Sequence, residues 1–106
     1  MSVVFDVIGV GTNSLDFIYV VPTHPVAGTG TAKQPVLAHR VSPGGQTATA
    51  LCACAAFGLR AAYVGAFGSD AHGMRMRDEL TSRGVDTRAA PTKACPNRHA
   101  EIGRAH

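Results

Sequence analysis

Tryptophan is absent from this 106-residue chain, and charged residues make up only 16% of it. The low charge, together with 45% hydrophobic residues, excludes an intrinsically disordered chain, which needs few apolar residues and a high net charge. No apolar run reaches the roughly 20 residues that a membrane-spanning helix requires. Neither a heptad repeat nor a collagen-like repeat persists. We therefore expect at most one globular domain and no membrane partner.

Clustered positive charge is also lacking. The ten Lys and Arg residues exceed the seven Asp and Glu residues, for a net charge of +3, but they are scattered along the chain. Nucleic-acid binding needs a basic face, so we expect no nucleic-acid partner.

The cysteines Cys52, Cys54 and Cys95 form no CxxC pair, and no histidine stands at zinc-finger spacing from them. The sequence therefore predicts no metal site. Free thiols and the lack of a secretory signal in the first residues indicate a cytoplasmic protein.

The first 41 residues predict strands. Residues 3–10 form a nearly continuous β-branched run, which favours a parallel strand buried on both faces. Residues 17–21 and 36–41 are further β-type runs, and the Gly, Thr, Ala and Pro-rich segment 26–35 between them predicts a turn. This hairpin interrupts the alternation of the rest of the chain, so we expect it to form a separate flap.

The following residues predict alternating turns, helices and strands. Residues 42–45 predict a turn, and the Ala-rich segment 46–57 predicts a helix buried nearly all round that stops at Gly58. Residues 61–67 predict a strand. A loop is predicted over 68–73 and a second helix over 73–83. We expect Ser69 or Asp70 to cap this helix, and Met76 and Leu80 to lie on its buried face. The helix should end at Gly84, and the chain should return to the sheet at Val85. Strand and helix alternating through short connections indicate an α/β fold with a parallel sheet.

One acidic residue and a pair of glycines stand out as candidate ligand-binding positions. Asp16 lies where a core strand gives way to the hairpin, and a carboxylate there is suited to accept hydrogen bonds from the hydroxyl groups of a polyol. Gly44 and Gly45 precede a helix whose first backbone N–H groups are free to bind a ligand. The polar side chains of that first turn, Gln46 and Thr49, are placed to face the same cleft. The alternatives are a turn-stabilising aspartate and an ordinary loop-to-helix turn.

The segment Gly9-Val-Gly11 suggests a dinucleotide-binding fingerprint, but the third glycine is replaced by Ser14, and a strand follows where that motif needs a helix. We expect these glycines to let the backbone pass close to another element. His72 has no partner in the sequence that would make it a catalytic base.

Taken in order, these segments resemble the N-terminal third of a ribokinase-like (PfkB) carbohydrate kinase. Residues 9–16 resemble the first strand with its sugar-binding aspartate, and residues 17–43 resemble the β-lid. The Gly44-Gly45 pair and helix up to Gly58 resemble the family's Gly-Gly motif. A third stretch resembles the family's VG…GxDxxG…GVDT pattern, in Val64-Gly65, Gly68-Ser-Asp70, Gly73 and Gly84-Val-Asp-Thr87.

The resemblance covers residues 5–100 and implies a partial ribokinase-like sheet with a β-lid insertion. It implies that Asp16, Gly44, Gly45, Gln46 and Thr49 bind a sugar or nucleoside, and that the lid supplies a contact for a homodimer. Gln46 and Thr49 stand where many members carry Asn. Both side chains can hydrogen-bond a hydroxyl group. Because they differ from the family's Asn residues, the resemblance does not identify the sugar.

By the same resemblance, ATP and Mg²⁺ act in the full-length enzyme, whose catalytic base and nucleotide site lie beyond residue 106. We therefore expect residues 1–100 to be the sugar-binding part of an ATP-dependent kinase that transfers the γ-phosphoryl group to a substrate hydroxyl, inactive by itself and binding no cofactor. The alternative is a non-catalytic α/β module that binds a small molecule or a partner strand.

The last residues, 101–106, do not fit the family pattern. One back-translation of residues 102–106 resembles a common sequencing-adapter sequence, so we expect a non-native tail after residue 100.

Overall fold

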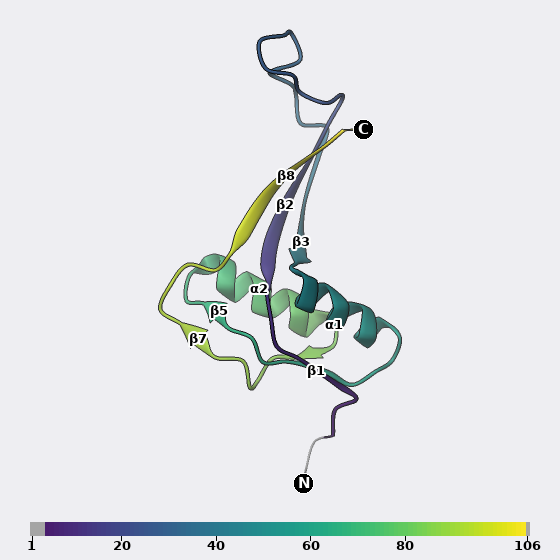
Figure 1. Ribbon diagram of the computed structural model, residues 1–106, viewed down its shortest axis with the longest axis vertical. Helices are drawn as coiled ribbons and strands as arrows, with labels where there is room; N and C mark the ends of the chain where they lie inside the picture. The colour runs from purple at the N-terminus through teal and green to yellow at the C-terminus, as the bar shows by residue number, and fades with distance from the viewer. Residues whose placement is uncertain (1–3, 106) are drawn as a thin grey trace.

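The computed structural model describes residues 4–105 and measures 61 × 33 × 18 Å. Figure 1 shows a body that contains both helices, from which a narrow sheet extends along the longest axis. No helix of the described residues is long and apolar enough to cross a membrane.

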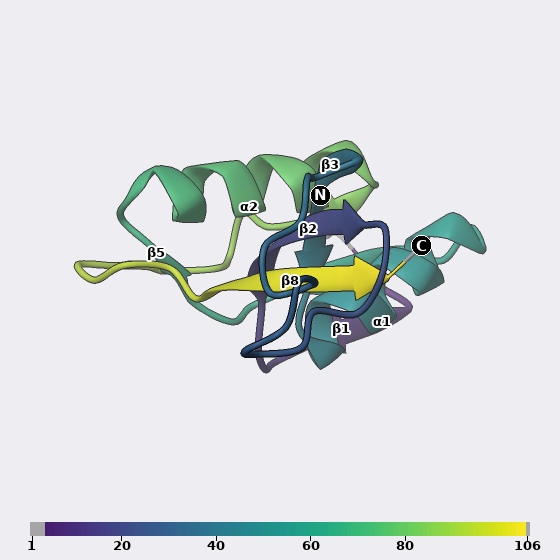
Figure 2. The same ribbon diagram turned by 90° about the horizontal axis from the view of Figure 1, so that it is seen from above.

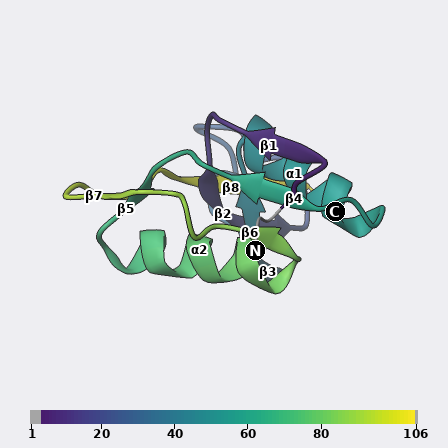
Figure 3. The ribbon, with the colours of Figure 1, turned by 90° about the horizontal axis from the view of Figure 1, so that it is seen from below.

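A parallel sheet lies in the body, as the sequence predicts. Its strand order is β1 (Val7–Gly9), β4 (Ala61–Tyr63) and β6 (Val85–Asp86). Val7, Ala61 and Val85 lie side by side in the strand register, and Figure 3 shows these strands with both helices. The mixed α/β class is therefore confirmed.

The two helices are α1 (Gln46–Ala56) and α2 (Ala71–Ser82). The core between helices and strands includes Leu51 of α1, Met76 and Leu80 of α2, and Tyr63 and Phe67. The positions predicted to end the helices are confirmed, since Gly58 and Gly84 each follow a helix with φ of +87°. This backbone conformation favours glycine.

Two predictions of burial are wrong for the described residues. Ile8, in the middle of β1, is 58% exposed, so the strand is not buried on both faces. In α1 only Ala48 and Leu51 are buried. The reason is that β1 and α1 each pack one face against the core, and no described element covers the other. Val3, the first residue of the predicted strand, lies outside the described residues.

A second sheet, which we call the hairpin sheet, consists of β2 (Ser14–Val21), β3 (Ala38–Gly44) and β8 (His99–Ala105), in the order β3-β2-β8. The predicted turn over 26–35 connects β2 and β3. The turn predicted over 42–45 is wrong, because β3 continues to Gly44, opposite Ser14. Pro43 is compatible with this strand because β3 lies at the sheet edge, where a missing N–H is tolerated.

The segment 101–105 belongs to β8 and pairs in parallel with residues 17–21 of β2. Its side chains are all exposed, so the pairing is made by the backbone. That this segment is non-native stays a prediction, and residue 106 lies outside the described residues.

The strand predicted over 61–67 is two strands. Beyond β4, residues 64–66 are not in a strand. The next strand is β5 (Phe67–Gly68), which pairs with β7 (Thr92–Lys93). A Cβ atom at Gly65 would overlap the Tyr63 hydroxyl group, so the break lets the backbone pass close to this side chain.

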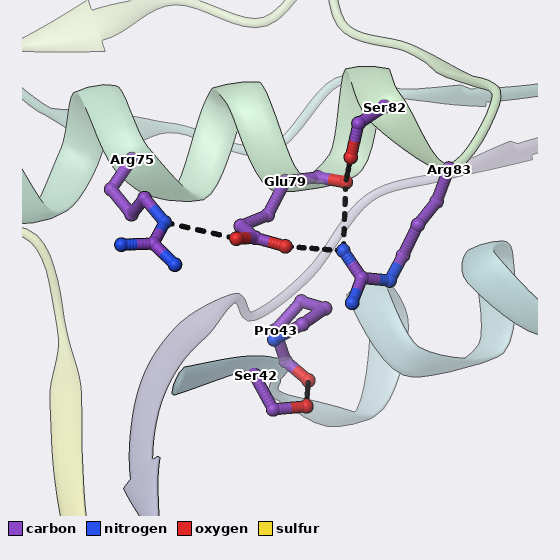
Figure 4. A network of polar contacts seen from close by, with 6 residues as sticks. All are labelled: Ser42, Pro43, Arg75, Glu79, Ser82 and Arg83. Atoms are coloured by element: carbon purple, nitrogen blue, oxygen red, sulfur yellow. Dashed lines mark hydrogen bonds and ion pairs between the residues drawn. The ribbon is translucent and has the colours of Figure 1, made fainter. Parts of the chain in front are cut away.

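Helix α2 begins two residues earlier than predicted, at Ala71, and Asp70 is its N-cap. The Asp70 carboxylate accepts a hydrogen bond from the Gly73 N–H at 2.9 Å. Glu79, whose side chain is 17% exposed, pairs with the more exposed Arg75 and Arg83, one turn away on either side (Figure 4). Pairs with an exposed arginine contribute little to stability, so we attribute the position of α2 mainly to its buried face.

Two methionines of α2 test this packing. Met76 is fully buried, whereas Met74 is 67% exposed. We predict that Met76→Ala lowers the free energy of unfolding by about 2–5 kcal/mol, while Met74→Ala changes it by less than about 0.5 kcal/mol. Urea unfolding of both variants measures this difference, and equal losses would contradict the assigned core.

The cap of α2 predicts a pH dependence. The pKa of Asp70 lies below its ordinary value of 3.8, first because the Asn97 N–H and then because the Gly73 N–H donates to the carboxylate. Ionised Asp70 therefore stabilises the folded chain above pH 3.8, and this contribution is lost as the pH falls through the lower folded pKa. Asp70→Asn keeps a capping oxygen without the charge, so thermal unfolding should show a smaller stability loss between about pH 6 and about pH 3 than in the parent chain. An unchanged loss would contradict this assignment.

Candidate functional site

Asp16 lies near the start of β2, where the hairpin sheet joins the body. The Ser14 hydroxyl group donates a hydrogen bond to its Oδ1 at 3.0 Å. On β3 the cross-strand partner of Asp16 is Ser42. A Cβ atom at Gly44 would overlap the Asp16 carboxylate. The structure therefore brings Asp16 and Gly44, both predicted site residues, into direct contact.

The first turn of α1 is held against the loop that precedes β2. Gly45, the N-cap, has φ of +87°, and a Cβ atom there would lie 2.8 Å from both the Asn13 Cα and the Thr12 carbonyl oxygen. The Ala48 N–H donates to that carbonyl at 3.3 Å. Because α1 has neither a side-chain cap nor an acidic residue in its first turn, no residue of the helix itself neutralises its N-terminal partial positive charge.

Gln46 and Thr49, the other predicted site residues, are both exposed in the first turn of α1. No hydrogen bond joins either side chain to Asp16 within residues 4–105. Thr47, between them, points the other way. A Cβ atom at Gly11 would overlap its hydroxyl group, and one at Gly9 would lie 2.8 Å from its methyl carbon. The prediction that these two glycines allow a close approach is confirmed.

A buried hydrogen-bond network lies behind the loop before β2, and its two asparagines were not predicted from the sequence. Asn13 donates from Nδ2 to the Tyr63 hydroxyl group at 2.8 Å and to the Ala66 carbonyl at 2.7 Å. Asn97 donates to the Asn13 Oδ1 at 3.0 Å. Burial raises the pKa of Tyr63, so its hydroxyl group stays protonated and donates to the Gly11 carbonyl at 2.6 Å.

Three histidines surround Phe17 on the side of the hairpin sheet that faces α2. The Phe17 ring lies 5.3 Å from His72, 6.2 Å from His99 and 6.3 Å from His39, and the His72 and His99 rings lie 4.7 Å apart. The spacing of these histidines along the chain does not indicate that they lie together. Within residues 4–105, no group of three or more His, Cys, Asp or Glu side chains is arranged to hold a metal ion.

A cavity of about 410 Å³ lies farther along the hairpin sheet, lined by Ile18, Val20, Ala38 and Arg40 among others. Side chains alternate between faces along a strand, so Ile18 and Val20 share the Asp16 face. Figure 2, from above, shows β2 between its neighbours in this sheet. The cavity therefore lies on the face of β2 that carries Asp16, but none of the candidate site residues lines it.

Comparisons with known proteins agree with this arrangement. The model of the pfkB family carbohydrate kinases matches residues 5–99. No curated protein matches the chain.

Among solved structures, a protein from Agrobacterium tumefaciens assigned as a ribokinase is 30% identical with a TM-score of 0.80, over 93% of this chain and 32% of that one. The Arabidopsis thaliana ribokinase complexed with ribose and ATP is 21% identical with a TM-score of 0.74, over 97% and 33%. The Cryptococcus neoformans ribokinase in complex with ADP is 22% identical with a TM-score of 0.75, over 96% and 32%.

The chain thus spans about a third of the length of these structures, and its described residues have their mixed α/β fold. On the family match over residues 5–99, this chain belongs to the pfkB family of carbohydrate kinases.

Proposed function

We propose that the chain is the sugar-binding part of an ATP-dependent kinase that transfers the γ-phosphoryl group to a hydroxyl group of a sugar or nucleoside. The observation that carries the proposal is the Asp16 carboxylate, held against Gly44 beside the first turn of α1. Family membership supports the phosphotransfer. The complexes of ribokinase with ribose and ATP, and of aminoimidazole riboside kinase with its riboside and an ATP analogue, support this substrate class.

In this proposal, Asp16 accepts hydrogen bonds from two hydroxyl groups of the substrate. Such charge-assisted bonds are stronger than neutral ones. Ser14 holds Oδ1 from one side and leaves the second oxygen for the substrate. The missing side chains at Gly44 and Gly45 make room for the Asp16 carboxylate and for the backbone of residues 12 and 13. The carboxylate therefore lies beside the N-terminus of α1, where we propose that the sugar ring binds. Gln46 and Thr49 are exposed in that turn and supply further hydrogen bonds to the sugar.

ATP supplies the phosphoryl group, and Mg²⁺ neutralises the charge of its phosphates. The described residues contain no cluster suited to a metal ion, so these residues do not fit a Mg²⁺ site. We propose that the nucleotide site, the metal and the catalytic base belong to other parts of the complete kinase, and that residues 1–100 alone are inactive and bind no cofactor.

We further propose that the hairpin sheet, residues 17–43 above all, is the lid of the sugar site. It extends away from the body (Figure 1), and Asp16 lies at its base. A lid closing over the sugar would exclude water from the transfer. The exposed edge of β3 offers unpaired backbone groups, which supports a contact between two copies of the lid. The free thiols support a cytoplasmic location.

The charge of Asp16 is testable in the complete kinase. Asp16→Asn keeps the shape but removes the charge, so we predict a sugar KM raised by about 10- to 100-fold, with the ATP KM unchanged. Asp78→Asn, at an exposed position of α2, is the matched control. Steady-state kinetics measure both variants, and an unchanged sugar KM for Asp16→Asn would overturn the proposed role.

The space beside the carboxylate is tested separately. A Cβ atom at Gly44 overlaps the Asp16 carboxylate, whereas one at Gly30 meets nothing within 4 Å. We predict that Gly44→Ala displaces the carboxylate and raises the sugar KM by about tenfold or more, while Gly30→Ala leaves it unchanged. If both variants keep the parent KM, the space at Gly44 is not part of the site.

A further inference from the structure

We propose that Asn97 and Asn13 are positioning residues, which hold the Asp16 strand at a fixed place beside α1. This inference rests on the proposed function, because the two residues act on sugar binding through Asp16. Both side chains are among the few buried polar ones, with 5% of Asn97 and 6% of Asn13 exposed. Neither belongs to the candidate sugar-binding set.

Asn97 lies just before β8 and joins three segments of the chain. Its Nδ2 donates to the Asn13 Oδ1 at 3.0 Å and to the Arg98 carbonyl at 2.9 Å, and its Oδ1 accepts from the Gly68 N–H at 2.9 Å. Its own N–H donates to the Asp70 carboxylate at 3.0 Å. The start of β8 is thereby attached both to β5 and to the N-cap of α2.

The Arg98 carbonyl connects Asn97 to the site. This carbonyl also accepts a hydrogen bond from the Leu15 N–H at 3.1 Å, so Asn97 fixes the acceptor that holds the residue next to Asp16. The pairing of β2 with β8 starts here, since Leu15 lies opposite His99 and Asp16 opposite Ala100. A shift of Asn97 would therefore move the backbone that carries the carboxylate.

Asn13 holds β2 at a fixed distance from α1. Its side chain is held by Tyr63 and Ala66, and its Cα faces Gly45 at the distance where a Cβ atom would not fit. The Nδ2 and Oδ1 atoms of both Asn13 and Asn97 have hydrogen-bond partners. Among the described residues, no buried side-chain polar atom is left without one. A buried pair of this kind adopts one arrangement, because any other leaves an amide group without a partner.

A single substitution makes the contact dependent on pH. Asn97→Asp keeps the acceptor for Gly68 but loses the donor to Asn13 whenever the new carboxyl is ionised. Burial and the Asp70 carboxylate of α2 raise the pKa of this carboxyl, while Lys93 of β7 and Arg98, which line the adjoining cavity, oppose that rise. A protonated carboxyl has one O–H group, which again donates to Asn13, while the hydrogen bond to the Arg98 carbonyl stays lost.

The experiment measures the sugar KM, the ATP KM and kcat of Asn97→Asp in the complete kinase between about pH 5.5 and about pH 8. We expect the sugar KM to exceed that of the parent by about tenfold at the upper pH. This ratio should fall as the pH is lowered but stay above one, because the hydrogen bond to the Arg98 carbonyl is not restored. The ATP KM ratio should stay near one throughout. Asn13→Ser, which leaves Tyr63 and Ala66 without their donor, should raise the sugar KM at every pH.

Thr87→Val is the matched control. Thr87 is also buried, at 6% exposed, and its hydroxyl group bonds to Thr81 at the far end of α2, so the variant should lower thermal stability without changing the sugar KM. The inference is overturned if Asn97→Asp and Asn13→Ser fold and keep the parent sugar KM, or if Thr87→Val raises it equally. The proposed function fails separately, when Asp16→Asn leaves the sugar KM unchanged.

Discussion

The contact between residues 11–14 and the first turn of α1 is the constraint on which the site depends. At Gly11, Gly44 and Gly45 an added Cβ atom would collide with Thr47, with Asp16, or with the backbone of residues 12 and 13. The loop before β2 and the start of α1 can therefore be this close only because Gly11 in the loop, and Gly44 and Gly45 before the helix, have no side chain. This close approach leaves one carboxylate beside the N-terminus of a helix, where we propose that the sugar binds.

Hydrogen bonds within the protein stabilise this contact between residues 11–14 and the first turn of α1. The Tyr63 hydroxyl group donates to the Gly11 carbonyl, and the Ala48 N–H donates to the Thr12 carbonyl. Gly11 and Thr12 are themselves exposed, but these two hydrogen bonds join their carbonyls to Tyr63 and to α1 and so favour one arrangement of the loop. The hairpin sheet extends away from the body from this base (Figure 1).

Local patterns predicted much of this arrangement. Asp16 and the Gly44-Gly45 pair were identified from residue type and position, and the ends of both helices from their glycines. The Asn13–Asn97 contact spans 84 residues, and two separated asparagines give no local signal, so it could not be predicted. The burial of Ile8 was predicted wrongly because an apolar run shows that a strand can be covered, but not which element covers it.

The proposed function depends on the binding of a sugar hydroxyl group to the Asp16 carboxylate. This binding can be measured by following the carboxyl carbon of Asp16 by ¹³C nuclear magnetic resonance in the complete kinase while ribose is added. We predict a shift of the Asp16 signal that saturates with ribose, while the signal of Asp78 stays in place. A saturable change elsewhere in the protein with an unmoved Asp16 signal would contradict it.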